Sequence, residues 1–211
     1  MIDKEFAPIV PRSKKTRLRY RVAVLGSGSW ATAIIKIISA NLEHIHWWVR
    51  SPEMAEEIAK YGHNPKYLSS VFINPEDVKV NTDIKAVVSK ADYVIIVTPS
   101  AYLHQSLEPL KRSQLGKKKI ILAVKGIVPE TLQLISDYMQ TQFKVPLENL
   151  SIISGPSHAE EIAQEHPSAL LVHDRGIRRT VLALFPLRRL LVPVAVHGEH
   201  GVAAVKIRTI G

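Results

Sequence analysis

The residues best suited to chemistry form a glycine-rich turn, Gly26-Ser27-Gly28-Ser29-Trp30-Ala31, between an apolar run and a segment of small and apolar residues. Gly26 permits a tight turn, Gly28 has no Cβ to block a diphosphate, and Ala31 is small enough for close strand–helix packing. The free N–H groups that open a helix attract phosphate. The pattern predicts a dinucleotide-binding turn, and an ordinary strand–turn–helix is the alternative.

A basic residue ends the second apolar run, Trp47-Trp48-Val49-Arg50. In NAD-selective sites an acid stands roughly 20 residues after the glycines and binds the ribose hydroxyls. This run has no acid at its end, and the guanidinium of Arg50 offers a planar fork of donors to a 2′-phosphate or stacks on adenine. The sequence predicts NADP or NAD as cofactor, with NADP favoured. The alternative is that Arg50 is a solvated surface residue.

Short β-branched runs alternate with longer helical stretches. Strands are predicted at residues 20–26, 45–50, 93–99, 119–126 and 150–155, and helices at 29–41, 52–60, 101–112, 130–140 and 157–165. Several of the runs are continuously apolar, as strands covered on both faces require. The order predicts an α/β fold, a doubly wound, mostly parallel Rossmann-type sheet with helices on both faces. Residues 61–81, with two Asn-Pro pairs, are predicted to form a long irregular connection.

The composition sets limits on the class of protein. The chain has 211 residues, 46% hydrophobic and 22% charged, which suits a globular domain with a core. It has no apolar run of about 18 residues, so no membrane span is expected. Its start has no apolar signal segment. Without cysteine there is no disulfide and no thiolate metal site, which fits a reducing cytoplasm, and no metal is expected.

The net charge of +9 is unevenly distributed. Cations crowd the start of the chain, at Lys4, Arg12, Lys14, Lys15, Arg17, Arg19 and Arg21. Residues 1–19 are therefore predicted to be a basic N-terminal arm, and residues 20–195 the cofactor domain. Among these cations only Phe6 and Tyr20 supply aromatic rings, so no nucleic-acid partner is expected.

Six ordered motifs together resemble the bacterial NAD(P)-dependent glycerol-3-phosphate dehydrogenases over about residues 20–170. They are Gly26-Ser27-Gly28-Ser29-Trp30-Ala31-Thr32-Ala33, Trp47-Trp48-Val49-Arg50, His63-Asn64-Pro65-Lys66-Tyr67-Leu68, Val97-Thr98-Pro99-Ser100, Val124-Lys125-Gly126-Ile127 and Ser154-Gly155-Pro156-Ser157-His158-Ala159-Glu160-Glu161. The resemblance implies an oxidoreductase that interconverts dihydroxyacetone phosphate and sn-glycerol 3-phosphate, the backbone precursor of glycerophospholipids.

The resemblance also assigns residues. It implies cofactor contacts for Ser29, Trp30, Arg50 and Ala159, substrate contacts for Gly155 and Ser157, and both for Lys125. Lys125 ends a buried run, where open α/β sheets bind ligands, and carries a compact charge for an anionic substrate. The alternatives are a surface lysine for Lys125 and a plain helix N-cap for Ser157. Thr98-Pro99-Ser100 is expected to approach the nicotinamide, and the loop with His63 and Asn64 to cover the active site.

Reduction of a ketone needs a group that protonates or polarises the carbonyl oxygen. The family uses a lysine in a stretch like Gly-Ala-x-Lys-Asn, and the nearest match is Ala203-Ala204-Val205-Lys206. Lys206 is the predicted catalytic acid/base. The alternative is an unremarkable lysine near the chain end.

The family match fades after about residue 171. From there on the chain has one lysine and six arginines, whereas the earlier part of the chain is rich in lysine. A shifted reading frame in this tail is one hypothesis. The resemblance implies a helical substrate domain that closes the active site and builds a homodimer, of which residues 196–211 would be only the start or a remnant. The chain is thus expected to be a truncated copy. Two alternatives stay open: a nucleotide-binding fragment without turnover, and a related 2-hydroxy- or keto-acid reductase.

Overall fold

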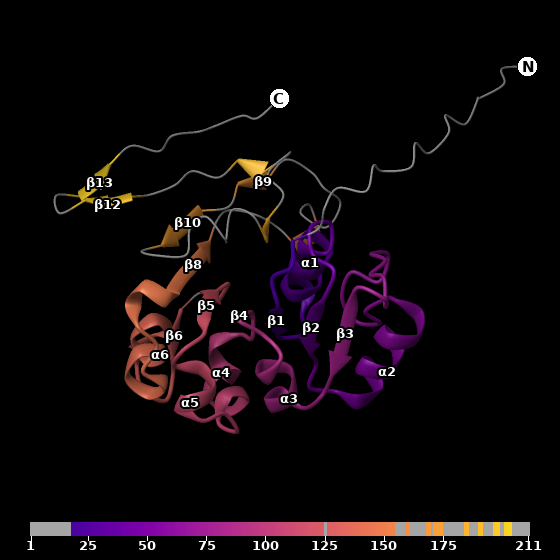
Figure 1. Ribbon diagram of the computed structural model, residues 1–211, viewed down its shortest axis with the longest axis horizontal. Coiled ribbons are helices and arrows are strands. Elements are labelled where there is room, and N and C mark those ends of the chain that lie inside the picture. The colour runs from indigo at the N-terminus through magenta and orange to yellow at the C-terminus, as the bar shows by residue number, and fades with distance from the viewer. Residues whose placement is uncertain are drawn as a thin grey trace, which may run out of the picture.

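The structure is a computed structural model. It describes residues 18–124, 126–154, 159–160, 168–169, 171–174, 184–185, 190–191, 196–198 and 201–203. The clearest features are a seven-stranded sheet and the helices that cover it (Figure 1). No described helix is long and apolar enough to cross a membrane.

The sheet has the strand order β10-β8-β5-β4-β1-β2-β3. Its strands are β1 Val22–Leu25, β2 Ile45–Trp48, β3 Val78–Asn81, β4 Tyr93–Ile96, β5 Lys119–Leu122, β8 Leu150–Ser154 and β10 Leu171–Asp174. All neighbours pair in parallel except β10, which runs antiparallel to β8. The chain moves outward from β1 in one direction through β2 and β3, and in the other through β4, β5 and β8. This confirms the predicted doubly wound, mostly parallel α/β fold.

Helices connect the parallel strands. They are α1 Ser29–Ile38, α2 Pro52–Tyr61, α3 Ile84–Ser89, α4 Ser100–Leu107, α5 Arg112–Leu115 and α6 Ile135–Phe143, with a short 3-10 turn at Leu147–Asn149. In Figure 1, α2 lies beside β3, and α4, α5 and α6 gather toward β5 and β8. Three two-stranded pairs stand apart from the main sheet: β6 Ile127–Val128 with β7 Gln133–Leu134, β9 Ser168–Ala169 with β11 Leu190–Leu191, and β12 Val196–Gly198 with β13 Gly201–Ala203.

Both faces of the sheet are buried, which is why its strands are continuously apolar. Successive residues of a strand point to opposite faces. Val22 and Val24 of β1 accordingly join a core cluster with α1, whereas Ala23 and Leu25 join a second cluster that includes residues of α3, α4 and α6. All four side chains are fully buried. The sheet is the shared wall of two hydrophobic cores.

Helix α2 shows how local sequence sets the element boundaries. The hydroxyl of Ser51 accepts a hydrogen bond from the Met54 N–H at 3.2 Å, and Pro52 occupies the first turn, where its missing N–H costs nothing. The helix ends at Gly62, whose φ of 72° is the left-handed conformation that glycine adopts most easily.

Two sequence-based boundaries were wrong. The predicted irregular connection at residues 61–81 ends in a strand, β3, which pairs with β2 at the sheet edge. Its sequence Val78-Lys79-Val80-Asn81 alternates apolar and polar, as a half-exposed edge strand requires. The helix predicted from residue 130 begins at Ile135, because residues 127–134 form the β6–β7 hairpin instead.

Candidate cofactor-binding site

The glycine-rich turn joins the carboxyl end of β1 to the start of α1. Gly26 has a φ of +136°, a conformation that side-chain-bearing residues rarely adopt. A Cβ on Gly26 would lie 3.0 Å from the backbone nitrogen of Thr98 and 3.0 Å from the carbonyl carbon of Val97. The turn therefore passes so close to the end of β4 that only glycine fits.

Gly28 lies in the opposite kind of environment. It is the N-cap of α1, no side chain caps this helix end, and a Cβ on Gly28 would have no atom within 4 Å. The first N–H groups of a helix lack partners within the helix and carry a partial positive charge. Open space beside uncapped N–H donors is what a diphosphate group needs, so this turn fits a dinucleotide.

A tryptophan of β2 makes a hydrogen bond to the backbone of the turn. The Trp47 indole Nε1 donates a hydrogen bond to the Gly26 carbonyl at 2.6 Å, and its side chain is fully buried. This role of Trp47 is not evident from any motif in the sequence. The sequence offers only one indication of it: a buried indole N–H usually has a hydrogen-bond acceptor.

The turn lies at the point where the strand order reverses, between β1 and β4. Open α/β sheets bind ligands in the crevice at the carboxyl ends of such strands. Thr98 follows β4 at this edge, and its buried hydroxyl donates to the Leu25 carbonyl at 3.2 Å. Thr98-Pro99-Ser100 thus lies beside the turn. Its approach to the nicotinamide stays a prediction.

Arg50 stands two residues beyond the end of β2, with its side chain exposed. Its guanidinium carbon lies 5.8 Å from the ring centroid of Tyr102, a residue of α4 that is 52% exposed. A cationic plane and an aromatic ring can together flank a purine base or receive a phosphate. Tyr102 was missed from sequence, because an aromatic residue in the helix after an apolar strand is usually a packing residue.

An acid also lies close to the end of β2. The Ser51 hydroxyl donates to Oε2 of Glu53 at 2.5 Å, and this hydrogen bond holds the pKa of Glu53 below its ordinary value. Glu53 is three residues from Arg50. Glu53 lies beyond the strand end where the sequence predicts no acid, and its side chain is bonded back to Ser51 near that end. An ionised carboxylate here opposes the binding of a 2′-phosphate near Arg50.

The remaining predicted residues divide into two groups. Ser29 and Trp30 open α1, and both Trp30 and Ala159 are partly buried against the core cluster on the α1 face. Lys125, Gly155, Ser157 and Lys206 lie outside the described residues, so their predicted roles stay predictions. Gly126, next to Lys125, has a φ of +105°, and a Cβ on it would lie 3.2 Å from the Ser100 hydroxyl. The chain after β5 therefore returns to the edge of the sheet where α4 begins.

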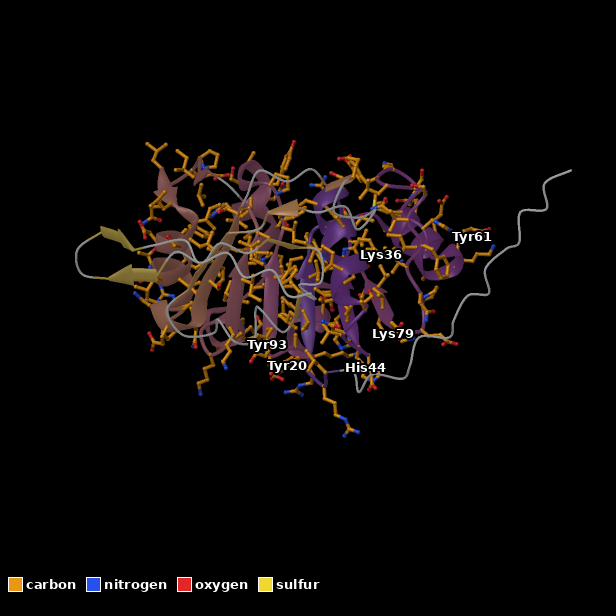
Figure 2. The ribbon with its side chains drawn as sticks, turned by 90° about the horizontal axis from the view of Figure 1, so that it is seen from above. Tyr20, Lys36, His44, Tyr61, Lys79 and Tyr93 are labelled. Carbon is orange, nitrogen blue, oxygen red and sulfur yellow. The ribbon has the colours of Figure 1, made fainter. Side chains whose placement is uncertain are left out.

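A cavity of about 620 Å³ lies at the opposite, amino edge of the sheet. Tyr20 and Tyr93 line it with their ring centroids 5.3 Å apart, and Figure 2 shows them side by side. Asp92 there receives two hydrogen bonds from Arg21, at 2.6 and 2.8 Å. This edge has no glycine-rich turn, and we place the cofactor at the carboxyl edge.

Comparison with known proteins identifies the family of the chain. A family model described as the NAD-dependent glycerol-3-phosphate dehydrogenase N-terminus matches residues 21–177. The chain belongs to this family. Membership confirms the resemblance seen in the six motifs and agrees with NAD or NADP as the cofactor of the domain.

Relatives named glycerol-3-phosphate dehydrogenase [NAD(P)+] match with similar extent. The protein from Oceanobacillus iheyensis is 34% identical over 150 residues, which cover 71% of this chain and 43% of the relative. The one from Pseudomonas syringae is 35% identical over 151 residues, 72% of this chain and 43% of the relative. A crystal structure of glycerol-3-phosphate dehydrogenase from Coxiella burnetii has a TM-score of 0.73 and 26% identity, covering 83% of this chain and 54% of that one. The chain spans about half the length of the glycerol-3-phosphate dehydrogenases that it matches.

Proposed function

We propose that this chain binds NAD or NADP and serves the interconversion of dihydroxyacetone phosphate and sn-glycerol 3-phosphate. The observation that carries the proposal is the turn at residues 26–31. It combines open space at Gly28, uncapped N–H groups of α1 and a place at the switch point of the sheet. Family membership supports the choice of reaction.

We propose that different residues of the chain bind different parts of the cofactor and the substrate. The turn receives the diphosphate, while Arg50 and Tyr102 receive the adenosine end. A bound nicotinamide supplies or accepts the hydride. We propose that Lys125, Gly155 and Ser157 hold the phosphorylated substrate, and that Lys206 gives a proton to the carbonyl oxygen during reduction, as the resemblance implies.

A second candidate is nucleotide binding without turnover. It is favoured because the family model that matches is that of the N-terminus, and the described site is a cofactor-binding turn. Catalysis needs the substrate held in place and water kept out, and these tasks require more surface than a cofactor-binding turn provides.

One set of measurements separates the candidates. Oxidation of NADPH and NADH would be followed with dihydroxyacetone phosphate, and cofactor binding would be followed through tryptophan fluorescence. Turnover that Lys206→Ala abolishes supports the dehydrogenase. Binding without turnover supports the second candidate, and absence of binding to either cofactor contradicts both.

Arg50→Asp tests the assignment of the adenosine end. We expect the Kd for NADPH to rise at least tenfold and that for NADH to rise less, because only NADPH loses charge-assisted hydrogen bonds to a 2′-phosphate. Arg19→Asp, an equal charge change at an exposed residue of the amino edge, should leave both Kd values unchanged. Equal losses for both cofactors in Arg50→Asp would remove Arg50 from this role.

We further propose a cytoplasmic location and a contribution to glycerophospholipid synthesis. The absence of cysteine supports the first. The second follows from the proposed product, which is the backbone precursor of these lipids.

A further inference from the structure

A buried carboxamide lies directly behind the glycine-rich turn. Asn64, in the loop after α2, has no exposed surface. Its Nδ2 group donates to the Ser27 carbonyl at 3.0 Å and to the Thr32 hydroxyl at 2.8 Å. Its Oδ1 accepts from the backbone N–H groups of Lys66 at 3.1 Å and Tyr67 at 3.2 Å. These four bonds use both donors and both acceptor sites of the amide.

The two donated bonds act on the phosphate-binding part of the turn. Thr32 links Asn64 to Gly28, because its hydroxyl accepts the bond from Asn64 and donates to the Gly28 carbonyl at 3.1 Å. In a trans peptide the N–H points opposite to the C=O. Holding the Ser27 and Gly28 carbonyls toward Asn64 and α1 therefore turns the N–H groups of Gly28 and Ser29 outward, away from the protein interior.

The two accepted bonds shape the loop that carries Asn64. This loop, residues 62–73, closes on itself where the Ile73 N–H donates to the Gly62 carbonyl at 2.8 Å. Lys36 of α1 holds its far end through a bond from Nζ to the Phe72 carbonyl at 3.2 Å. Lys36 and Tyr61, which ends α2 just before the loop, lie toward the same end of the molecule in Figure 2. One side chain thus joins a self-contained loop to the turn.

We propose that Asn64 is a positioning residue for the cofactor diphosphate. Through the Ser27 carbonyl and the Thr32 hydroxyl it sets the direction in which the turn presents its N–H groups. This inference rests on the proposed function, because it presumes that the turn binds a dinucleotide. It also accounts for a fully buried amide in a loop that leaves Tyr67 and Phe72 exposed.

The test compares two ligands, one with and one without a diphosphate. We expect Asn64→Ala and Thr32→Val each to raise the Kd for NADPH about tenfold, the effect of losing a buried hydrogen bond that orients a charged ligand. The Kd for 2′-AMP, which has no diphosphate, should stay within about twofold of the wild-type value. Thr32→Ser keeps the hydroxyl and should retain the wild-type affinity for NADPH.

A pair of controls separates positioning from general destabilisation. Tyr138→Phe removes the 3.0 Å hydrogen bond to His104 on the other face of the sheet, and should lower Tm without changing the Kd for NADPH. The double variant Asn64→Ala/Thr32→Val should weaken NADPH binding by less than the sum of the two single effects, because Thr32 receives one of the two bonds that Asn64 donates.

Three results would overturn the inference. One is an unchanged Kd for NADPH in folded Asn64→Ala and Thr32→Val. Another is an equal loss of affinity for NADPH and 2′-AMP, which would show a general structural effect. The third is a wild-type protein that binds neither NADPH nor NADH, in which case the proposed function has failed and the inference fails with it.

Discussion

At the scale of single residues, the turn holds two glycines, Gly26 and Gly28, that are needed for different reasons. A Cβ at Gly26 would meet the backbone after β4 at 3.0 Å, and its φ of +136° is itself unfavourable for other residues. A Cβ at Gly28 would meet nothing, and its φ of −79° suits any residue. The fold requires the first glycine, and we propose that the ligand requires the second.

Substitution by alanine should separate these two needs. We expect Gly26→Ala to lower the free energy of unfolding by about 1–3 kcal/mol, because it forces both strain and a backbone contact. Gly28→Ala should leave Tm nearly unchanged and raise the Kd for NADPH and NADH by at least tenfold, since the methyl group occupies the space of the diphosphate. Thermal unfolding and a fluorescence titration would measure both. The reverse pattern would mean that the open space at Gly28 is not the diphosphate site.

At the scale of elements, β2 carries a histidine, His46, whose protonation depends on folding. Burial lowers the pKa of His46 from its ordinary value of 6.5, and the nearby charges of Lys90 and His44 lower it further. A lowered pKa in the folded protein means that the unfolded chain binds the proton more tightly. The stability associated with neutral His46 is present above about pH 6.5 and is lost as pH falls through the folded pKa.

This linkage predicts a specific difference in pH dependence. The free energy of unfolding of the wild-type protein should fall between pH 7.5 and pH 5, and the fall should be smaller in His46→Gln, which cannot take up the proton. Urea denaturation at a series of pH values would measure it. Parallel curves for the two proteins would show that His46 does not contribute.

Elements with strong local patterns were predictable from sequence, and those that depend on distant contacts were not. The apolar runs of β1, β4 and β5 and the tight turn at residues 26–31 were predictable, because burial on both faces and the close approach of the turn to the end of β4 each demand a restricted set of residues. The four-residue strand β3 was hidden in a loop-like composition, since its pairing with β2 is what makes it a strand. The roles proposed for Asn64 and Tyr102 depend on Ser27 and Arg50, which lie 37 and 52 positions away in the chain, and no local pattern reveals these contacts.

At the scale of the whole molecule, one sheet serves two cores. Ile95 and Ile96 are neighbours on β4 and both fully buried, yet they belong to different clusters. Ile95 packs in the cluster that includes α1, and Ile96 in the cluster that includes α6. Both hydrophobic cores include side chains of the same strands, so neither core can form without the sheet.

Because the sheet is shared, a destabilising substitution on one of its faces should also reduce the stability of the helices on the other face. Ile96→Ala should lower the free energy of unfolding by about 2–5 kcal/mol, the usual effect of a large cavity in a packed core. Hydrogen exchange should then show α1 losing protection by about as much as α6, because the most protected amides exchange only through global unfolding. Leu132→Ala, at a side chain that is 76% exposed, should change neither helix. Loss of protection confined to α6 would show that the two faces unfold separately.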